Sequence, residues 1–353
     1  MEFVIDKLAR RYQMMGHKPV VVAQRPRHNR EIPQLPYDVI YYPRPRSAVW
    51  LLQYVEYVLK REHKRYGFDV IHAHLAYPNG YIACKIKDEL NVPIVITSHK
   101  GDIIPESRYR QRPVTCKRMC WALANVNAAT GVSSELKGII DELSMGKANS
   151  HFVPNGVDIP EDNEGQIPES CTELAGRPFM LTLGRLHYYK GLDVLLEAMK
   201  LLKEKSGELP ILIIAGDGRE KGNLSQQVKD LGLIANVIFA GSVFGEQKHW
   251  LLRNCTFFLQ PSRAEGMPLT VLEAMAYKKV VIGTKISGTI ELIDDGVNGI
   301  LVEPEDSQML CDAIRNLVDT SDLTSLQKKA FDTASKLSWQ TVAKRYLELY
   351  SKA

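Results

Sequence analysis

Short apolar runs alternate with stretches of helical periodicity along almost the whole chain. The runs predict strands of parallel sheets, because strands buried on both faces are continuously apolar. In the first half the predicted strands are 19–23, 38–41, 69–73, 93–97 and 126–130. In the second half they are 179–183, 211–215, 237–240, 256–259 and 280–283. Between them, helical spacing such as that of Leu192, Leu195, Leu196, Met199 and Leu202 predicts amphipathic helices.

This alternation of strands and helices predicts an α/β fold with helices on both faces of parallel sheets. It occurs twice, and the stretch 160–176 between the two repeats is rich in acids, proline and glycine, as linkers often are. We therefore expect two Rossmann-like doubly wound domains, 1–160 and 161–337. Ligands of such folds bind at the carboxyl ends of the strands, so we expect an interdomain cleft.

The first residues depart from this plan. Phe3, Leu8 and Tyr12 predict an amphipathic helix from about residue 2, followed by a turn at 16–18. A doubly wound domain ordinarily opens with a strand and a glycine-rich turn before its first helix. Neither precedes the predicted helix, so we expect the first sheet to lack its opening strand.

The composition is typical of a soluble globular protein: 45% of the 353 residues are hydrophobic and 24% are charged. No apolar run approaches the ~20 residues that a membrane-spanning helix needs. Acids at Glu2 and Asp6 interrupt any signal-peptide pattern. The six cysteines are scattered without a CxxC pair, which disfavours a zinc site or a disulfide framework. We expect a cytoplasmic location.

The net charge of +4 conceals an asymmetry. Residues 1–150 hold 23 Lys and Arg against 14 Asp and Glu, whereas the remainder holds 22 against 27. A solvated basic face is one explanation. The other is an anionic partner of the first half, either a lipid surface or a phosphorylated acceptor. Nucleic acid is disfavoured, because aromatic residues do not interleave with the basic ones as a stacking surface requires.

The strongest candidate for chemistry is the segment 262–276, which follows a predicted strand. Pro268 suits the first turn of a helix, and Gly266 allows close approach of backbone to a ligand. The N–H groups at the helix start would form an anion site suited to a diphosphate. Glu265 would lie on the loop, and Glu273 about a turn and a half into the helix. The alternative is a polar loop with a solvated helix glutamate.

A second candidate is the loop from Gly184 to Gly191, between a predicted strand and a helix. Arg185 and Lys190 on this loop can clamp two phosphates. A generic basic turn is the alternative. The segment 215–218 does not complete a dinucleotide-binding GxGxxG motif, because Lys221 stands at the third glycine, and no P-loop motif is present.

Histidines end two predicted strands of the first half. His99 follows strand 93–97 and could hydrogen-bond a sugar hydroxyl or move a proton, although a lone histidine is often structural. His72 and His74 share one face of their strand, but a metal site lacks a third ligand. The sequence contains no Asp-x-Asp, so a metal–diphosphate site of that type has no support, and we expect no metal.

These segments together resemble glycosyltransferase family 4, whose members are retaining enzymes of the GT-B fold. The similar segments, in the family's order, are Ser98 to Asp102, Val153 to Asp158, Gly184 to Gly191, Phe239 to Val243, Glu265 to Glu273, and Ser338-Trp339 with the terminal helix. By this resemblance, 338–353 would form a helix packing back on the first domain. The likeness covers nearly the whole chain and is more specific in its second half.

The resemblance implies a role for each motif. Arg185 and Lys190 would neutralise the donor diphosphate, Glu265 would accept hydrogen bonds from the donor sugar, and Glu273 would bind the ribose hydroxyls. The implied catalytic residues are His99, Arg185, Lys190 and Glu265, with Asp102 on the acceptor side. The implied donor-binding residues are Gly184, Gly216, Asp217, Val243, Gly266, Met267, Pro268, Leu269, Thr270 and Glu273.

The implied activity is hexosyl transfer from a UDP- or GDP-sugar, without a further cofactor, to a glycan or lipid-linked acceptor. Retention of configuration, and a role in surface polysaccharide or glycolipid synthesis, follow from the same resemblance. The basic first domain would allow peripheral contact with an anionic membrane at its inner face.

The family's members begin with a strand and a glycine-rich loop that this sequence lacks. We therefore expect weak or no activity from this chain, and recovery when such a segment is restored. A non-catalytic nucleotide-sugar-binding protein is the main alternative. A nucleotide-sugar epimerase is a further one, which the phosphate clamp and the paired glutamates disfavour.

Overall fold

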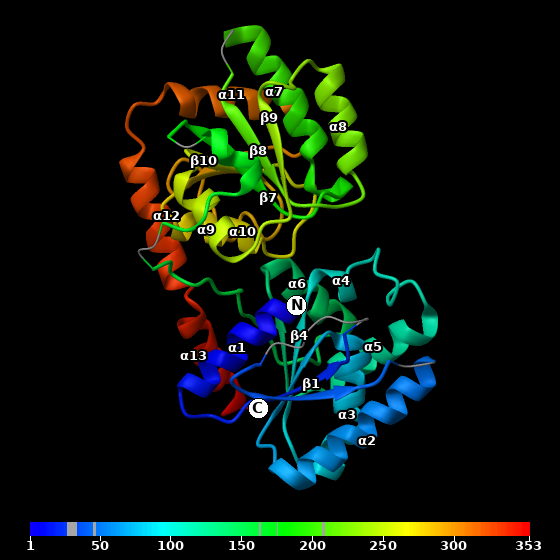
Figure 1. The fold of residues 1–353 in the computed structure, drawn as a ribbon. Coiled ribbons are helices and arrows are strands. Elements are labelled where there is room, and N and C mark those ends of the chain that lie inside the picture. The colour runs from blue at the N-terminus through cyan, green and yellow to red at the C-terminus, as the bar shows by residue number, and fades with distance from the viewer. Residues whose placement is uncertain (27–33, 45–46, 162–163, 175, 207–208) are drawn as a thin grey trace. The chain divides into compact units, whose positions relative to one another are not determined.

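The computed structural model describes residues 1–26, 34–44, 47–161, 164–174, 176–206 and 209–353. The chain divides into two compact units (Figure 1). The first unit comprises Met1–Gly156 and Trp339–Ala353, and the second comprises Val157–Ser338. The chain therefore passes from one unit to the other twice, and its last helix belongs to the unit in which it begins.

The strands of the first unit form two separate parallel sheets. One sheet pairs β1 (Val20–Gln24) with β2 (Asp38–Tyr42). The other has the order β3 (Ile71–His74), β4 (Ile94–Ser98), β5 (Ala128–Gly131) and β6 (Ser150–Phe152). Every residue of β4 and β5 is buried, whereas Val20 to Ala23 of β1 are only half-buried. The core of this unit is therefore centred on the four-stranded sheet.

Helices surround these sheets, and serine side chains cap two of them. Ser47 accepts a hydrogen bond from the N–H of Trp50, and Ser133 accepts one from that of Leu136. The helices are α1 (Glu2–Met14), α2 (Ala48–Tyr66), α3 (Tyr81–Leu90), α4 (Lys100–Ile103), α5 (Pro113–Asn125), α6 (Ser134–Leu143) and α13 (Trp339–Tyr350), with a π-helix η1 (Ala76–Gly80). In Figure 1, α13 lies beside α1, and the two helices are in contact.

The second unit contains one parallel sheet in the order β12-β11-β10-β7-β8-β9. Its strands are β7 (Phe179–Leu183), β8 (Ile211–Ala215), β9 (Val237–Gly241), β10 (Phe257–Gln260), β11 (Val280–Thr284) and β12 (Ile300–Val302). Its helices are α7 (Leu192–Ser206), α8 (Lys221–Asp230), α9 (Gly245–Asn254), α10 (Leu269–Ala276), α11 (Ser307–Asp319) and α12 (Thr324–Lys336), with 3-10 turns η2 (Glu169–Leu174) and η3 (Tyr188–Lys190). Helices α7, α8 and α11 share the core cluster on one sheet face, and α10 packs against α12 (Figure 1).

The predicted α/β fold with two Rossmann-like halves is confirmed. A strand lies at each of the ten predicted positions, displaced by at most two residues at either end. Strands β6 and β12 were not predicted, because each has only three residues, too few to establish a period. The predicted first helix is α1, and Gly16 in the following turn has a φ of 88°.

A chain of polar side chains joins the terminal helices to the sheet of the first unit. The Tyr12 hydroxyl lies 2.8 Å from that of Tyr350, which lies 2.6 Å from Nδ1 of His72. Nε2 of His72 lies 2.7 Å from the Thr97 hydroxyl. Because each buried polar atom in this chain has a partner, α1 and α13 are held in a defined position over β3 and β4.

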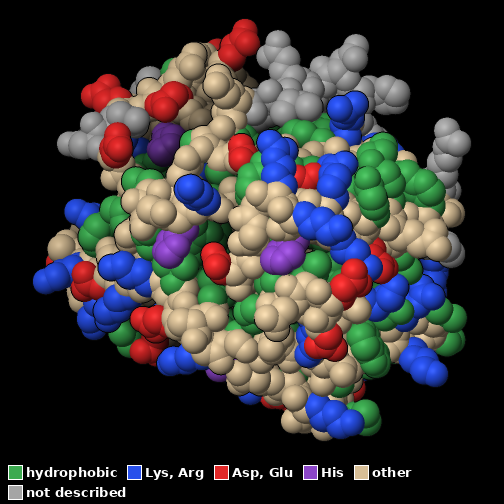
Figure 2. All heavy atoms as spheres, turned by 90° about the horizontal axis from the view of Figure 1, so that it is seen from below, with side chains coloured by type: hydrophobic (Ala, Val, Ile, Leu, Met, Phe, Trp, Pro, Cys, Tyr) green, Lys and Arg blue, Asp and Glu red, His purple; other side chains and the backbone are tan. Residues whose placement is uncertain are grey.

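The outer side of α2 carries aromatic and basic side chains together. The rings of Trp50 and Tyr54 stack at 4.6 Å between centroids, and the guanidinium of Arg61 lies 5.8 Å from the Tyr57 ring centroid. Lys60 pairs with Glu89 at 2.6 Å. Figure 2 likewise shows Lys and Arg side chains in several groups on one face of the molecule, with Asp and Glu among them. Residues 1–150, which hold the excess of basic residues, therefore also carry acidic side chains at the surface.

Gly156 lies directly against Trp339, which is fully buried at the start of α13. A Cβ at this glycine would stand 2.7 Å from two carbons of the indole ring. We expect Gly156→Ala to lower the free energy of unfolding by about 1–3 kcal/mol, because the ring has no room to move. Urea denaturation followed by tryptophan fluorescence measures the change.

Gly138 in α6 is the matched control, because a Cβ there meets no atom within 4 Å. Alanine is also the better helix former, so Gly138→Ala should leave stability unchanged or raise it slightly. Equal stability of the two variants would contradict the packing described for Gly156.

Candidate functional site

The loops at the carboxyl end of the second sheet lie unusually close together. The N–H of Gly184 donates to the carbonyl of Ala215 at 2.9 Å, and the N–H of Gly216 donates to that of Gly241 at 2.6 Å. A Cβ on Gly216 would stand 1.8 Å from the carbonyl oxygen of Gly184, and one on Gly191 would stand 1.9 Å from that of Pro261. Glycine is therefore the residue that allows the loops after β7, β8, β9 and β10 to meet.

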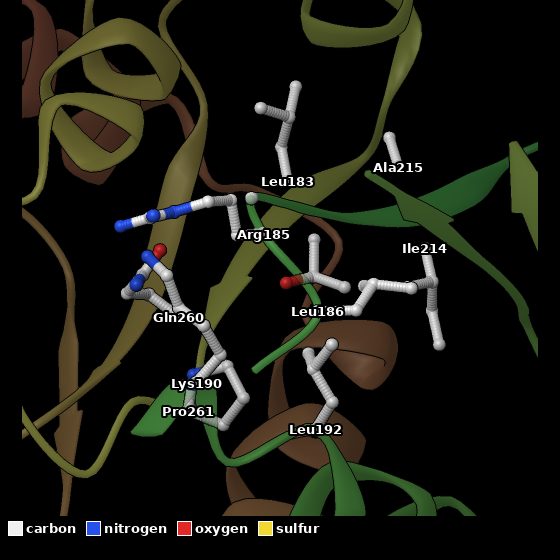
Figure 3. Close-up of a pocket in the computed structure, with 11 residues that line it drawn as sticks. Leu183, Arg185, Leu186, Lys190, Leu192, Ile214, Ala215, Gln260 and Pro261 are labelled. Carbon is white, nitrogen blue, oxygen red and sulfur yellow. The ribbon is translucent and has the colours of Figure 1, made fainter. Parts of the chain in front are cut away.

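A small pocket opens among these loops (Figure 3). The polar ends of Arg185 and Gln260 point to the same side of it, and Lys190 lies below them in this view. Leu192 and Ile214 line it from α7 and β8. The pocket thus combines an apolar base with convergent polar groups, as small-molecule sites commonly do.

Glu265 is the centre of the polar cluster. Its Oε1 accepts hydrogen bonds from Nζ of Lys190 at 2.6 Å, Nε2 of Gln260 at 2.9 Å and the Ser262 hydroxyl at 2.9 Å. The side chains of Lys190 and Glu265 are only 15% and 13% exposed. The Thr270 hydroxyl donates to the carbonyl oxygen of the Gln260 side chain at 3.1 Å. Gln260 therefore couples the glutamate loop to the first turn of α10.

Helix α10 begins at Leu269, directly after the N-cap residue Pro268. Among the described residues, the side chain of Pro268 forms no capping hydrogen bond. Thr270 lies in the first turn, and the helix then buries Val271 and Leu272. Glu273 points to α9 and pairs through Oε1 with Nζ of Lys248 at 2.6 Å. The positive end of the helix dipole therefore lies on the same segment as both glutamates.

Arg263 fastens the glutamate loop to α7. Its guanidinium forms two hydrogen bonds of 2.7 Å with the carboxylate of Asp193 and one of 2.7 Å with the Tyr188 carbonyl, and it also contacts Glu305. The hydrogen bonds with Asp193 and Glu305 raise the pKa of Arg263 further above its usual value. This bidentate pairing keeps Glu265 close to η3, which carries Lys190.

The other predicted donor residues lie on the same loops. Gly216 and Asp217 follow β8, and Oδ1 of Asp217 accepts from the N–H of Gly218 at 2.8 Å. Val243 is buried after β9. The carbonyl of Gly266 lies against Gly288, where an added Cβ would stand 2.3 Å from it, and Met267 is buried. The second unit thus brings all its predicted site residues to one end of its sheet.

His99 and Asp102 belong to the first unit. Nε2 of His99 lies 3.2 Å from Nδ1 of His74, and their rings are stacked. The fully buried carboxylate of Asp102 accepts from the N–H groups of His99 and Ala76, both at 2.8 Å. Asp102 therefore joins the segments that follow β3 and β4. Burial raises the pKa of Asp102 to about 7 and lowers the pKa of His99 to about 4.

Two family models match the chain. The model described as Glycosyltransferase Family 4 matches residues 1–161, and the one described as Glycosyl transferases group 1 matches residues 166–333. The chain belongs to glycosyltransferase family 4. It is therefore a glycosyltransferase with the GT-B fold, as the resemblance of its motifs predicted.

Curated relatives of this glycosyltransferase share about a quarter of its residues. An uncharacterized glycosyltransferase of Methanocaldococcus jannaschii is 27% identical over 81% of this chain and 76% of its own length. A D-inositol 3-phosphate glycosyltransferase of Corynebacterium urealyticum is 28% identical over 80% and 71%. The alpha-monoglucosyldiacylglycerol synthase of Streptococcus pneumoniae is 26% identical over 81% and 67%.

Solved structures share the fold over the whole glycosyltransferase. HepE from Anabaena, in complex with UDP, is 21% identical and matches with a TM-score of 0.79 over 100% of this chain and 96% of its own. Sucrose-phosphate synthase from Thermosynechococcus elongatus is 19% identical and matches with a TM-score of 0.82 over 99% and 92%. At these low sequence identities, the similarity shows a shared fold and nothing further.

Several neighbours of the site were not predicted from the glycosyltransferase sequence. Gln260 and Lys248 contact site residues, and Arg263 fastens the loop that carries Glu265 to α7, but each lies in a segment where a polar residue has many ordinary explanations. For His74 the sequence suggested only a metal site that lacks a third ligand. Among the residues that the structure describes, no group of three or more His, Cys, Asp or Glu could hold a metal ion. Nor is any helix there long and apolar enough to cross a membrane.

The histidine next to Asp102 yields a prediction on stability. Because burial holds the pKa of His99 at about 4, below its usual 6.5, the folded state binds fewer protons than the unfolded state between these values. Stability from this neutral histidine is complete above pH 6.5 and is lost as the pH falls towards 4. Between pH 6.5 and 5 the protonation of His99 alone should lower the free energy of unfolding by about 1–2 kcal/mol. Asp102, whose pKa is raised to about 7, acts in the opposite direction over this interval.

His99→Gln removes this titration and keeps that of Asp102, so over the same pH interval its stability should fall less, or rise more, than that of wild type. Urea denaturation at each pH measures both slopes, and comparing slopes cancels any constant loss caused by the substitution. Identical slopes, or an imidazole titration near pH 6.5 by NMR, would contradict the buried neutral state.

Proposed function

We propose that this glycosyltransferase takes a sugar from a nucleoside diphosphate sugar and transfers it, with retention, to a glycan or lipid-linked acceptor. The observation that carries the donor assignment is the cluster of Lys190, Glu265 and Gln260 beside Arg185 and the start of α10. It offers cations for a diphosphate and a carboxylate for sugar hydroxyls within one small site. UDP and GDP are the nucleotides to test, UDP first because HepE was solved with it.

The diphosphate would bind between Arg185, Lys190 and the N–H groups of Leu269 and Thr270. Two cations and a helix N-terminus stabilise the charge that develops on the leaving nucleotide. Lys190 now pairs with Glu265 at 2.6 Å. Donor binding would therefore place the phosphate against Lys190 and the sugar hydroxyls against Glu265, exchanging an internal ion pair for two contacts with the donor. No metal or further cofactor enters this scheme.

The mechanism of retention that fits this site best is a front-face route, in which the leaving phosphate assists the acceptor. Oε1 of Glu265 accepts hydrogen bonds from Gln260 and Ser262 and would accept one from a sugar hydroxyl, which makes that oxygen a poor nucleophile for a glycosidase-like double displacement. Neutral His99 would hydrogen-bond the transferred sugar. Asp102 would act on the acceptor side by fixing the two segments that it joins.

A glycolipid or surface polysaccharide is the proposed acceptor class. The similar proteins include a monoglucosyldiacylglycerol synthase and a D-inositol 3-phosphate glycosyltransferase, which supports a lipid-linked or phosphorylated acceptor. The aromatic and basic side chains of α2 would meet an anionic lipid surface. This arrangement would place the enzyme in the cytoplasm, at the inner face of a membrane.

Isothermal titration with UDP and with GDP tests the donor site. We expect Arg185→Ala to weaken binding of the preferred nucleotide by roughly 10- to 100-fold, because it removes charge-assisted hydrogen bonds to phosphate. Arg315→Ala is the matched control, since Arg315 lies on α11 and pairs with Asp312. Loss of affinity in both variants, or in neither, would contradict the assignment.

Product analysis then separates transfer from binding alone. Radiolabelled nucleotide sugars should yield free sugar or a glycosylated acceptor, and NMR of the product linkage reports its anomeric configuration. Tight nucleotide binding without either product would instead support the non-catalytic binding protein. An inverted product would contradict retention while leaving the donor site intact.

Co-sedimentation with vesicles tests the membrane contact. Binding to phosphatidylglycerol vesicles should exceed binding to phosphatidylcholine vesicles and should weaken as salt is added. Reversing Lys64 and Arg65, which are exposed at the end of α2, should weaken it roughly fivefold per charge. Reversing exposed Lys229 and Lys328 of the second unit is the control and should have little effect. Equal binding to both vesicle types would contradict this part of the proposal.

A further inference from the structure

Gln260 is a buried amide at the end of a central strand, and no motif includes it. It is the last residue of β10, which pairs with β7 on one side and β11 on the other. Its side chain is almost fully buried and lines the small pocket together with Arg185 and Lys190 (Figure 3). A buried polar side chain on so rigid a backbone requires hydrogen-bond partners.

Both N–H donors of this amide are used within the protein. Nε2 of Gln260 donates to the Ser262 hydroxyl at 2.6 Å and to Oε1 of Glu265 at 2.9 Å. The side-chain oxygen of Gln260 accepts from the Thr270 hydroxyl at 3.1 Å. Because a primary amide has two N–H donors, none remains for a bound ligand. Any effect of Gln260 on a ligand must therefore pass through the residues that it holds.

The hydrogen bonds around this amide allow one orientation only. The Ser262 hydroxyl accepts from Gln260 and donates to the same Oε1 of Glu265 at 2.9 Å. Since an ionised carboxylate can only accept, a flipped amide would set two acceptor oxygens against each other. Gln260 and Ser262 thus fix Oε1 of Glu265 from β10 and the residues after it, independently of Lys190.

This independence matters because Lys190 has two roles in the proposed donor site. It pairs with Glu265 at 2.6 Å, and it would bind the diphosphate when the donor is present. Once Lys190 turns to the phosphate, Gln260 and Ser262 still hold the carboxylate in place. Gln260 also holds Thr270, whose N–H group belongs to the proposed phosphate site. It therefore connects the group proposed for the sugar with the helix start proposed for the diphosphate.

We propose that Gln260 is a positioning residue, which keeps the Glu265 carboxylate oriented towards the donor sugar while Lys190 binds the diphosphate. This inference rests on the proposed donor site. Functional groups act efficiently only when their neighbours hold them within a fraction of an ångström of the productive geometry. Loss of the amide should therefore weaken recognition of the sugar and spare that of the nucleotide, which Gln260 has no donor to contact.

Isothermal titration of wild type and Gln260→Met tests this role. The probes are UDP with UDP-glucose, UDP-galactose and UDP-N-acetylglucosamine, and GDP with GDP-mannose. The measured quantity is the Kd of the nucleotide sugar that wild type binds best, divided by the Kd of its free nucleotide. Methionine keeps the length of the side chain without its hydrogen bonds. We expect this ratio to rise about tenfold and the Kd of the free nucleotide to change less than about twofold.

Ser262→Ala is a second, smaller change to the same network. It removes the other hydrogen bond that holds Oε1 of Glu265 from this side and leaves Gln260 in place. We expect the same ratio to rise about threefold, again without a change in the Kd of the free nucleotide.

Asn298→Leu is the matched control, because Asn298 is another buried amide of the second unit with three hydrogen bonds. Its nitrogen donates to the Leu292 carbonyl and the Thr333 hydroxyl, both at 2.9 Å, and its oxygen accepts from the N–H of Asp294 at 2.8 Å. It is not among the residues that line the small pocket. The control should lower the thermal stability and leave the ratio unchanged.

Thermal unfolding shows whether each variant is folded. The inference is overturned if folded Gln260→Met keeps the wild-type ratio, or if the free nucleotide loses as much affinity as the nucleotide sugar. An equal rise of the ratio in Asn298→Leu would also overturn it. If Gln260→Met does not fold, an unchanged ratio in Ser262→Ala overturns it. Failure of wild type to bind UDP or GDP would instead defeat the proposed function itself.

Discussion

The donor half of this glycosyltransferase depends on close contact between backbone segments at one end of a parallel sheet. Gly216 and Gly191 approach carbonyl oxygens so closely that no other residue fits at either position. Because the loops after β7, β8 and β10 touch, side chains from three separate segments reach one small volume. Arg185, Lys190 and Gln260 thereby face a common space without a long flexible loop to carry them.

Electrostatics then determines how the charged side chains of the site pair with one another. Lys190 and Glu265 neutralise each other, and Gln260 and Ser262 use the same carboxylate oxygen. Partly buried charges of this kind need partners, because water cannot fully solvate them. A donor with a negative diphosphate and neutral hydroxyls can replace both partners at once. The site is thus arranged for a ligand that carries charge at one end and hydroxyls at the other.

The sequence predicted the parts of this design that depend on a repeating pattern. Ten strands followed from apolar runs, and the segment from Glu265 to Glu273 was recognised by its position after a strand. Strands β6 and β12 were missed because three residues establish no period. Partners such as Lys248 were missed for a different reason: a lysine in a surface helix has no local signal, and its role depends on a glutamate 25 positions away. The roles of the individual site residues still rest on the family's motifs and on geometry.

The division of the first unit into two sheets bears on how that unit moves. Strand β4 pairs with a neighbour on each side and is fully buried, whereas β1 pairs with β2 alone among the described residues and is half-buried. Amides in singly paired, partly solvated strands exchange with deuterium through small local openings, whereas those in a fully paired interior require larger ones. The first unit should therefore exchange in two kinetic classes, with the β1–β2 pair opening well before the four-stranded core unfolds.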